Sequence, residues 1–181
     1  MTESRTDEAL VRDALRGDAE AFECLVLRYQ RVVFNAAWRL VGNTDDARDV
    51  CQNVFLKAYQ GLGSFDFSHA FHSWLYRIAL NEALNHNRKR RETGLLEEEE
   101  PPASDPAPDE RYARGELRAR LESVLAELSD DYRAVVVLKH IAGCSYEEIE
   151  AITGVPVKTV KSRLFTARQQ LRKALVLKGV V

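Results

Sequence analysis

Hydrophobic residues recur along most of the chain at the three- and four-residue spacing of amphipathic α-helices. With capping residues and glycines at the helix ends, this spacing predicts four helices in the first half, over about 6–15, 19–41, 44–60 and 69–91. It predicts four more in the second half, over about 112–128, 130–142, 145–153 and 156–178. No stretch shows the sustained two-residue alternation of a half-buried strand, so we expect an all-α protein.

Charge divides the chain into three parts. The 181 residues carry a net charge of −2, but residues 92–111 hold eight acidic residues, one basic residue and four of the five prolines. A segment with few apolar residues and charge of one sign buries too little surface to offset the entropy lost on ordering. We therefore expect a flexible acidic linker there, joining two small helical domains over 1–91 and 112–181.

Several classes of protein are excluded by what the sequence lacks. No apolar stretch approaches the roughly 20 residues of a membrane span, and no signal-peptide pattern is present, so we expect a cytoplasmic protein without membrane insertion. Cys24, Cys51 and Cys144 are far apart in apolar helical stretches, where we expect each to be buried. Metal-ligand spacing, a phosphate-binding loop and a nucleophile motif are all missing, so we expect no metal, cofactor or catalysis.

The C-terminal segment has the layout of a helix-turn-helix. Ser145 and Glu148 form a capping-box pattern at the start of its first helix, and this helix ends at Gly154. A short turn with Pro156 leads into the second helix. Residues 155–181 include seven basic residues and no acidic one, which is typical of a helix that contacts DNA phosphates and base edges. The alternative is an ordinary basic surface helix, or one that binds an acidic protein.

The predicted helix over 69–91 carries a second polar face. Its members are one aromatic residue, two amides and two arginines at helical spacing: Trp74, Arg77, Asn81, Asn85 and Arg88. Five of the 15 aromatic residues lie between residues 65 and 76, before or within the first turns of this helix. Rings beside amides and cations suit unstacked nucleic-acid bases. The alternative is that rings such as Phe65 and Phe71 fill the core of the domain.

The predicted helix over 44–60 is less basic. Acids and amides gather on one side of it: Asp46, Asp49, Gln52 and Asn53. Apolar residues occupy another side: Val50, Val54 and Ala58. The polar side is either a solvated face or a docking surface for a basic helix of a partner.

These motifs resemble those of extracytoplasmic-function (ECF, group 4) sigma factors, small members of the sigma-70 family of bacterial transcription initiation factors. The resemblance covers about residues 7–91 and 112–176, and three stretches carry it: DDARDVCQNVFLKAY, FHSWLYRIALNEALNHNRKRR and SYEEIEAITGVPVKTVKSRLFTAR. It implies a non-enzymatic subunit that binds core RNA polymerase, directs it to the −35 and −10 elements of promoters and assists promoter melting. The alternatives are a stand-alone helix-turn-helix regulator and a nucleic-acid enzyme, but a regulator has no need of a polymerase-docking helix.

The resemblance implies roles for the matching positions. The double-stranded −35 element would be bound by Lys158, Lys161, Ser162, Arg163, Phe165 and Arg168. The melted −10 strand would be bound by Phe65, Phe71, Trp74, Arg77, Asn81, Asn85 and Arg88. The clamp coiled coil of the largest polymerase subunit would be bound by Asp46, Asp49, Gln52, Asn53 and Phe55. Further expected partners are the flap of the second-largest subunit and an anti-sigma factor, and the protein would lie at the nucleoid when bound to polymerase.

Two positions in the first helix of the helix-turn-helix depart from the family pattern. Glu150 stands where a small residue is usual, and Thr153 stands where leucine is usual. We expect either residue to be able to loosen the packing against the second helix.

Overall fold

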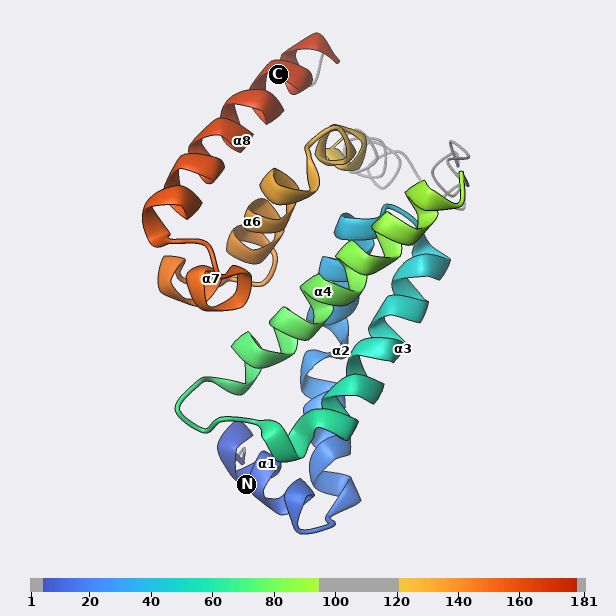
Figure 1. Ribbon diagram of the computed structural model, residues 1–181, viewed down its shortest axis with the longest axis vertical. Coiled ribbons are helices and arrows are strands. Elements are labelled where there is room, and N and C mark those ends of the chain that lie inside the picture. The colour runs from blue at the N-terminus through green and yellow to red at the C-terminus, as the bar shows by residue number, and fades with distance from the viewer. Residues whose placement is uncertain (1–4, 95–120, 179–181) are drawn as a thin grey trace, which may run out of the picture.

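The computed structural model describes residues 5–94 and 121–178, and every regular element in these ranges is a helix (Figure 1). The first range forms α1 (Asp7–Leu15), α2 (Ala19–Val41), α3 (Thr44–Gly61), the short 3₁₀ helix η1 (Leu62–Ser64) and α4 (Phe71–Glu92). In the second range, residues 121–126 are helical and are followed by α6 (Asp130–His140), α7 (Tyr146–Thr153) and α8 (Val157–Leu177). Within these ranges the all-α prediction is confirmed.

Most helix ends lie where the capping residues predicted them. Asp18 and Asn43 each cap a helix, because their side-chain oxygens accept hydrogen bonds from backbone N–H groups of the first turn of α2 and α3. Gly42 and Gly154 follow α2 and α7 in the left-handed conformation, with φ of 81° and 72°. A side chain disfavours this conformation, so glycine ends both helices.

Two helix ends differ from the predicted limits by two residues. α4 begins at Phe71 rather than at residue 69, because the preceding residues form a turn in which the Asp66 side chain accepts a hydrogen bond from the Ser68 N–H at 2.9 Å. α6 ends at His140, because the chain leaves the helical path before Gly143, where φ is 74°. A side-chain turn therefore precedes the start of α4, and a glycine in the left-handed conformation follows the end of α6.

The first unit of the fold is a bundle of α2, α3 and α4, with α1 packed at one end (Figure 1). Leu25 and Val33 of α2, Val54 of α3 and Leu75 of α4 are completely buried between the helices. Because each helix turns its apolar stripe inward, the polar sides of α3 and α4 face away from this core.

The second unit is smaller and consists of α6, α7, α8 and the short helix before them. Its core is formed by residues that are at most 1% exposed: Val124, Val135, Val137, Ile149, Val160 and Leu164. α7 and α8 are joined by a short turn and pack against each other and against α6. This is the predicted helix-turn-helix.

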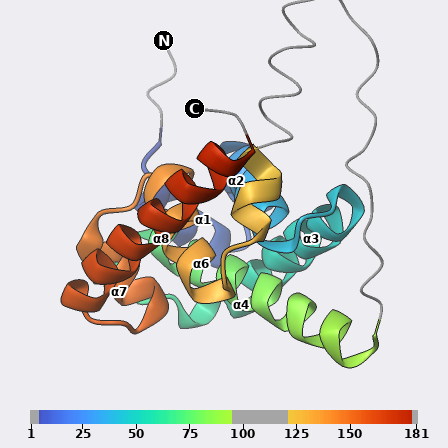
Figure 2. The same cartoon turned by 90° about the horizontal axis from the view of Figure 1, so that it is seen from above.

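The two units pack against each other. α4 contacts α7, α2 contacts α6, and buried residues of both units form one continuous hydrophobic cluster. Seen from above, α6 lies between α8 and the first bundle (Figure 2). The sequence pattern did not predict this packing. Only residues 92–94 of the predicted linker over 92–111 lie within the described residues. The first part of the predicted helix over 112–128 also lies outside them. The domain limits therefore stay predictions.

Candidate nucleic-acid and polymerase interfaces

The outward side of α8 carries most of the predicted −35 residues. Val160, Leu164 and Ala167 are buried, and this stripe turns the opposite side of the helix toward solvent. Five predicted residues are exposed: Lys158, Lys161, Ser162, Phe165 and Arg168. Phe165 is 66% exposed, although a large apolar ring gains from burial. Cationic donors beside one exposed ring match the phosphates, base edges and thymine methyl groups of a major groove.

Arg163 differs from these residues because it faces α6. Its Nη2 lies 2.8 Å from the Asp131 carboxylate, and the side chain is half-buried. Arg168 lies on the other edge of α8, where its Nη2 is 3.5 Å from Nε2 of His140. Partial burial lowers the pKa of His140, and the charges of Arg168 and Lys139 lower it further, so the neutral form of this ring is favoured. An ion pair therefore restrains Arg163, whereas Arg168 lies beside an imidazole and has no carboxylate partner among the described contacts.

Gln169 belongs to the same outward side, although the sequence pattern did not single it out. It is exposed and follows Ser162 and Phe165 at spacings of seven and four residues. Residues at these spacings share one side of a helix. The spacing could have identified Gln169, but an uncharged side chain adds nothing to a count of basic residues.

α7 is fixed at both ends by side-chain hydrogen bonds. Ser145 Oγ accepts from the Glu148 N–H at 3.1 Å, and a Glu148 carboxylate oxygen accepts from the Ser145 N–H at 2.7 Å. This completes the predicted capping box. At the other end, the Thr153 hydroxyl donates to the Ile149 carbonyl at 2.6 Å, and Glu150 is exposed. Neither departure from the family pattern opens the packing, since Ile149 stays completely buried.

The predicted polar side of α4 is exposed along most of the helix. Trp74 is half-buried. The other four members are exposed: Arg77, Asn81, Asn85 and Arg88. Amides and cations in one row can follow the bases and phosphates of a single strand. Arg77 also donates from Nη2 to the Ala151 carbonyl of α7 at 2.8 Å. One member of the row is therefore already bound by the second unit.

Phe65 and Phe71 lie in the core. They are 8% and 3% exposed, and their ring centroids lie 5.5 Å and 5.8 Å from that of Trp74. For these two rings the structure shows the core-filling role that the sequence left as the alternative, and their contact with a −10 strand stays a prediction. Phe67 in the same loop is 36% exposed, with the Arg12 guanidinium 4.2 Å from its ring centroid. The sequence pattern did not distinguish this ring from its buried neighbours.

The predicted clamp-binding side of α3 is exposed in its middle. The exposed members are Asp49, Gln52 and Asn53. Asp46 is turned toward α4 instead, where its carboxylate lies 3.0 Å from His86 and 3.4 Å from Arg90. Gln52 and the half-buried Phe55 line a shallow groove of about 470 Å³ between α2 and α3. Arg31 and Arg48 also line this groove, so the acid-and-amide patch, rather than the groove itself, is what attracts a basic helix.

Comparison with known proteins assigns the chain to a family. Residues 25–93 match the model of sigma-70 region 2, and residues 118–171 match that of sigma-70 region 4. The chain is 37% identical over 186 residues to the RNA polymerase sigma-H factor of Pseudomonas aeruginosa, covering 97% of this chain and 96% of that protein. The chain belongs to the sigma-70 family, in its ECF group. It is also 36% identical over 189 residues to the ECF RNA polymerase sigma-E factor of Escherichia coli, covering 94% of this chain and 95% of that protein.

Two solved structures share this fold. CnrH in complex with the cytosolic domain of CnrY is 32% identical with a TM-score of 0.73, covering 94% of this chain and 97% of CnrH. The sigma factor RpoE of Bartonella quintana, in complex with the anti-sigma factor NepR, is 28% identical with a TM-score of 0.70, covering 87% of this chain and 98% of RpoE. The first unit described above is therefore region 2 of this sigma factor, and the second unit is region 4.

The three cysteines of this sigma factor differ in their exposure. Cys144 is buried and Cys51 is half-buried. The predicted burial is wrong for Cys24, which is exposed. The adjacent Leu25 takes the core-facing position of α2 instead. Burial raises the pKa of Cys144 to about 12. Within residues 5–94 and 121–178, no group of three His, Cys, Asp or Glu side chains could hold a metal ion. None of the described helices is long and apolar enough to cross a membrane.

Proposed function

We propose that this RNA polymerase sigma factor reads promoters at two surfaces of its own chain. The outward side of α8 binds the −35 element as duplex DNA, and the polar side of α4 binds the melted −10 strand. The observation that best supports this proposal is that both sides are exposed while the opposite side of each helix is buried. A buried stripe fixes the direction of the donors, and base recognition requires donors with a fixed direction.

On α4, Asn81 is the residue that we propose binds an unstacked base. It is exposed one turn after Arg77 and two turns before Arg88. Its amide can donate and accept along a base edge, whereas the two arginines can bind the flanking phosphates. The ECF resemblance supports this role, since the family has an amide near a flipped-out base at the matching position.

Core polymerase is the partner that we propose for α3. The exposed patch of Asp49, Gln52 and Asn53, with the adjoining groove between α2 and α3, would bind the clamp coiled coil of the largest subunit. Asp46 would not contact the clamp directly but would position α3, because its carboxylate pairs with His86 and Arg90 of α4. Region 4 would contact the flap of the second-largest subunit.

We also infer an anti-sigma partner. The sigma factor RpoE, which has the same fold, was solved in complex with the anti-sigma factor NepR. CnrH, also of this fold, was solved in complex with the cytosolic domain of CnrY. The same family membership supports action in the cytoplasm, at the nucleoid when the protein is bound to polymerase, and no catalytic activity of its own.

Runoff transcription with purified core polymerase tests this function. The template is a library of genomic promoters, and core polymerase alone is the control. We expect a discrete set of promoters to be opened only when the sigma factor is present. Failure to open any promoter above core alone would refute the proposal. A pull-down with core polymerase separates a sigma factor from a stand-alone DNA-binding regulator, since the regulator would not be retained.

A further inference from the structure

His140 lies at the edge of the surface proposed for the −35 element. It is the last residue of α6, it is exposed, and α6 packs against α8. Nε2 of its ring lies 3.5 Å from Nη2 of Arg168, which is exposed on α8. A histidine from a helix outside the helix-turn-helix therefore adjoins the predicted DNA donors.

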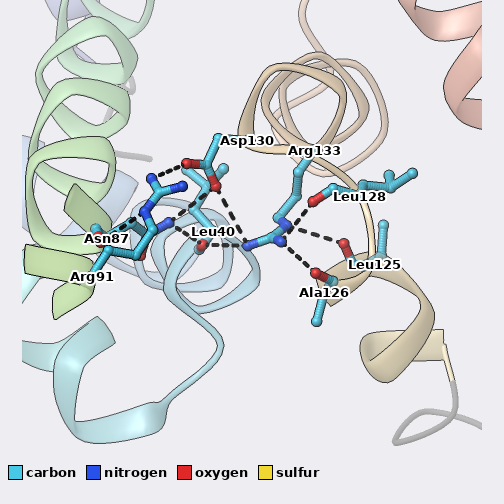
Figure 3. Close-up of polar contacts among 8 residues, drawn as sticks. All are labelled: Leu40, Asn87, Arg91, Leu125, Ala126, Leu128, Asp130 and Arg133. Carbon is cyan, nitrogen blue, oxygen red and sulfur yellow. Dashed lines mark hydrogen bonds and ion pairs between the residues drawn. The ribbon is translucent and has the colours of Figure 1, made fainter. Parts of the chain in front are cut away.

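Contacts at both ends of α6 fix the position of His140. Near the start of the helix, the Arg133 guanidinium donates at 3.0, 2.6 and 2.8 Å to three carbonyls of the preceding segment (Figure 3), those of Leu125, Ala126 and Leu128. At the other end, Lys139 Nζ donates to the Cys144 carbonyl at 2.9 Å. The backbone that carries His140 is thus restrained, whereas its ring is exposed and can exchange one partner for another.

The charged groups that face the His140 ring are both cations. They are Arg168 of α8 and Lys139 of α6. Partial burial and then these two positive charges hold the pKa of the ring below its ordinary value of 6.5. Lys139 Nζ also lies 4.7 Å from the centroid of the Tyr146 ring, and Lys161 Nζ lies 5.2 Å from the same centroid. The end of α6 thus continues the row of cations on α8.

The acidic groups of the helices packed around α6 lie beside other residues. Four of them have these partners: Glu127 with Lys178, Asp130 with Arg91, Asp131 with Arg163, and Glu148 with Ser145 and His72. Glu147 lines the space beside Arg77, and Glu150 is exposed on α7. On α2, the charged group nearest its end is Arg39, which donates to the Asn35 carbonyl. Among the described contacts, no carboxylate balances the cations around His140.

Given the proposed role of α8, on which this inference rests, we propose that His140 binds a phosphate of the −35 duplex as an imidazolium and so couples promoter binding to the uptake of one proton. In the free protein, Nε2 faces an arginine, which can only donate. This nitrogen can donate to a phosphate oxygen only after it has taken a proton from solvent. The charged ring then repels Arg168, so the guanidinium is released toward the base edges.

A helix in the major groove brings a phosphate within reach of His140. An α-helix with its side chains is about 10–12 Å across and the major groove is about 12 Å wide, so a recognition helix fills the groove. Elements beside such a helix lie over the phosphates that border the groove. α6 lies beside α8 at the edge that carries Arg168. A phosphate there supplies the negative charge that this cluster lacks, and it raises the pKa of His140 in the complex.

The direction of the pH dependence follows from these two states. Below the pKa of the free ring, His140 is charged with or without DNA. Above the pKa of the ring in the complex, it is neutral in both. Between the two values, affinity for the −35 duplex falls as pH rises, because the complex holds one more proton. A rise of about one pKa unit on binding makes the affinity up to about tenfold higher at the acidic end.

Fluorescence anisotropy with the full chain tests this coupling. The probe is a duplex that carries the −35 region of a promoter opened in the runoff assay, and the range is about pH 5.5 to 8 at fixed salt. His140→Gln replaces the ring with an amide that does not titrate, and His140→Arg keeps a cation at every pH. The matched control is His69→Gln, the same change at an exposed histidine of the loop before α4. Circular dichroism at both ends of the range checks that each variant is folded.

We expect the affinity of the wild type and of His69→Gln to fall about three- to tenfold from the acidic to the basic end. The profiles of His140→Gln and His140→Arg should be flat by comparison. At the acidic end, the slope of log affinity against log salt should be steeper by about 0.9 in the wild type than in His140→Gln, because one more phosphate is neutralised. A ring that only shaped the end of α6 would leave this slope unchanged.

A pH profile that is equal in the wild type and in His140→Gln would overturn the coupling. A flattened profile with an unchanged salt slope would overturn the phosphate contact. If the differences at His140 appear equally with an unrelated duplex, and no variant prefers the −35 sequence, the phosphate contact is supported and the recognition proposed for α8 fails instead. Absence of binding to any duplex would refute both.

Discussion

The capping box of α7 allows a direct test of how region 4 holds the first helix of its helix-turn-helix. Ser145→Ala removes the hydroxyl that accepts from the Glu148 N–H at 3.1 Å, and leaves the reciprocal bond from the Ser145 N–H in place. Loss of a serine N-cap destabilises a helix by about 1 kcal/mol, within a range of about 0.5–2. α7 has only eight residues, so few other bonds compensate for the loss. We therefore expect the free energy of unfolding to fall by about 1 kcal/mol.

The size of the thermal shift depends on whether the two regions unfold together. A loss of about 1 kcal/mol lowers the midpoint by about 2–4 °C for a unit of this whole chain's size, and by about 4–8 °C if region 4 unfolds alone. The continuous hydrophobic cluster favours joint unfolding. Trp38 and Trp74 both lie in region 2, so their fluorescence follows region 2 while far-UV circular dichroism follows all helices. Coincident transitions would show one cooperative unit.

Ser162→Ala is the matched control for this experiment. Ser162 is exposed on the outward side of α8 and caps no helix, and alanine is the better helix former, so stability should stay equal or rise slightly. Its effect should instead fall on −35 binding. Urea unfolding with an unchanged slope separates stability from changes in the unfolded state. A Ser145→Ala protein as stable as Ser162→Ala would refute the reasoning that the cap holds α7.

Three other changes test the remaining surfaces. Because we propose that its amide binds an unstacked base, Asn81→Ala should reduce open-complex formation, measured by permanganate footprinting, by the equivalent of about 1–3 kcal/mol. Core binding in a pull-down should stay unchanged, and normal melting would contradict this role. Arg168→Ala should weaken −35 binding in gel shifts by about 1–3 kcal/mol and relax the preference for one base. A uniform loss of affinity across −35 variants, with the slope of log affinity against log salt reduced by about 1, would instead assign Arg168 to a phosphate contact. Although partial burial opposes the effect, hydrogen bonds from the Ser145 N–H and from His72 lower the pKa of Glu148 below 4.5. A lowered carboxyl pKa stabilises the fold above the unfolded value and loses that contribution as pH falls through the folded value. Urea midpoints should therefore fall as pH drops below about 4.5, less steeply in Glu148→Gln, and parallel curves would show that this carboxyl is not responsible.

The helices and their ends could be predicted because their signals are local. Asp18 and Asn43 accept bonds from N–H groups only two or three residues away, and Gly154 needs only its own backbone conformation. The outward sides of α4 and α8 follow for the same reason, since a helical repeat places residues on one side whatever the helix packs against. Predictions of this kind depend on a few neighbouring residues and survive a change of tertiary context.

The errors and omissions concern contacts between segments distant in sequence. Periodicity could not separate the buried Phe65 from the exposed Phe67, since both are aromatic residues of one irregular loop. It could not place Asp131 beside Arg163, 32 residues later, so it missed the ion pair that restrains this arginine, whose −35 contact stays a prediction. Nothing in the local pattern linked Arg133 to a carbonyl 93 residues away. Such contacts are set by the packing of regions 2 and 4 as wholes.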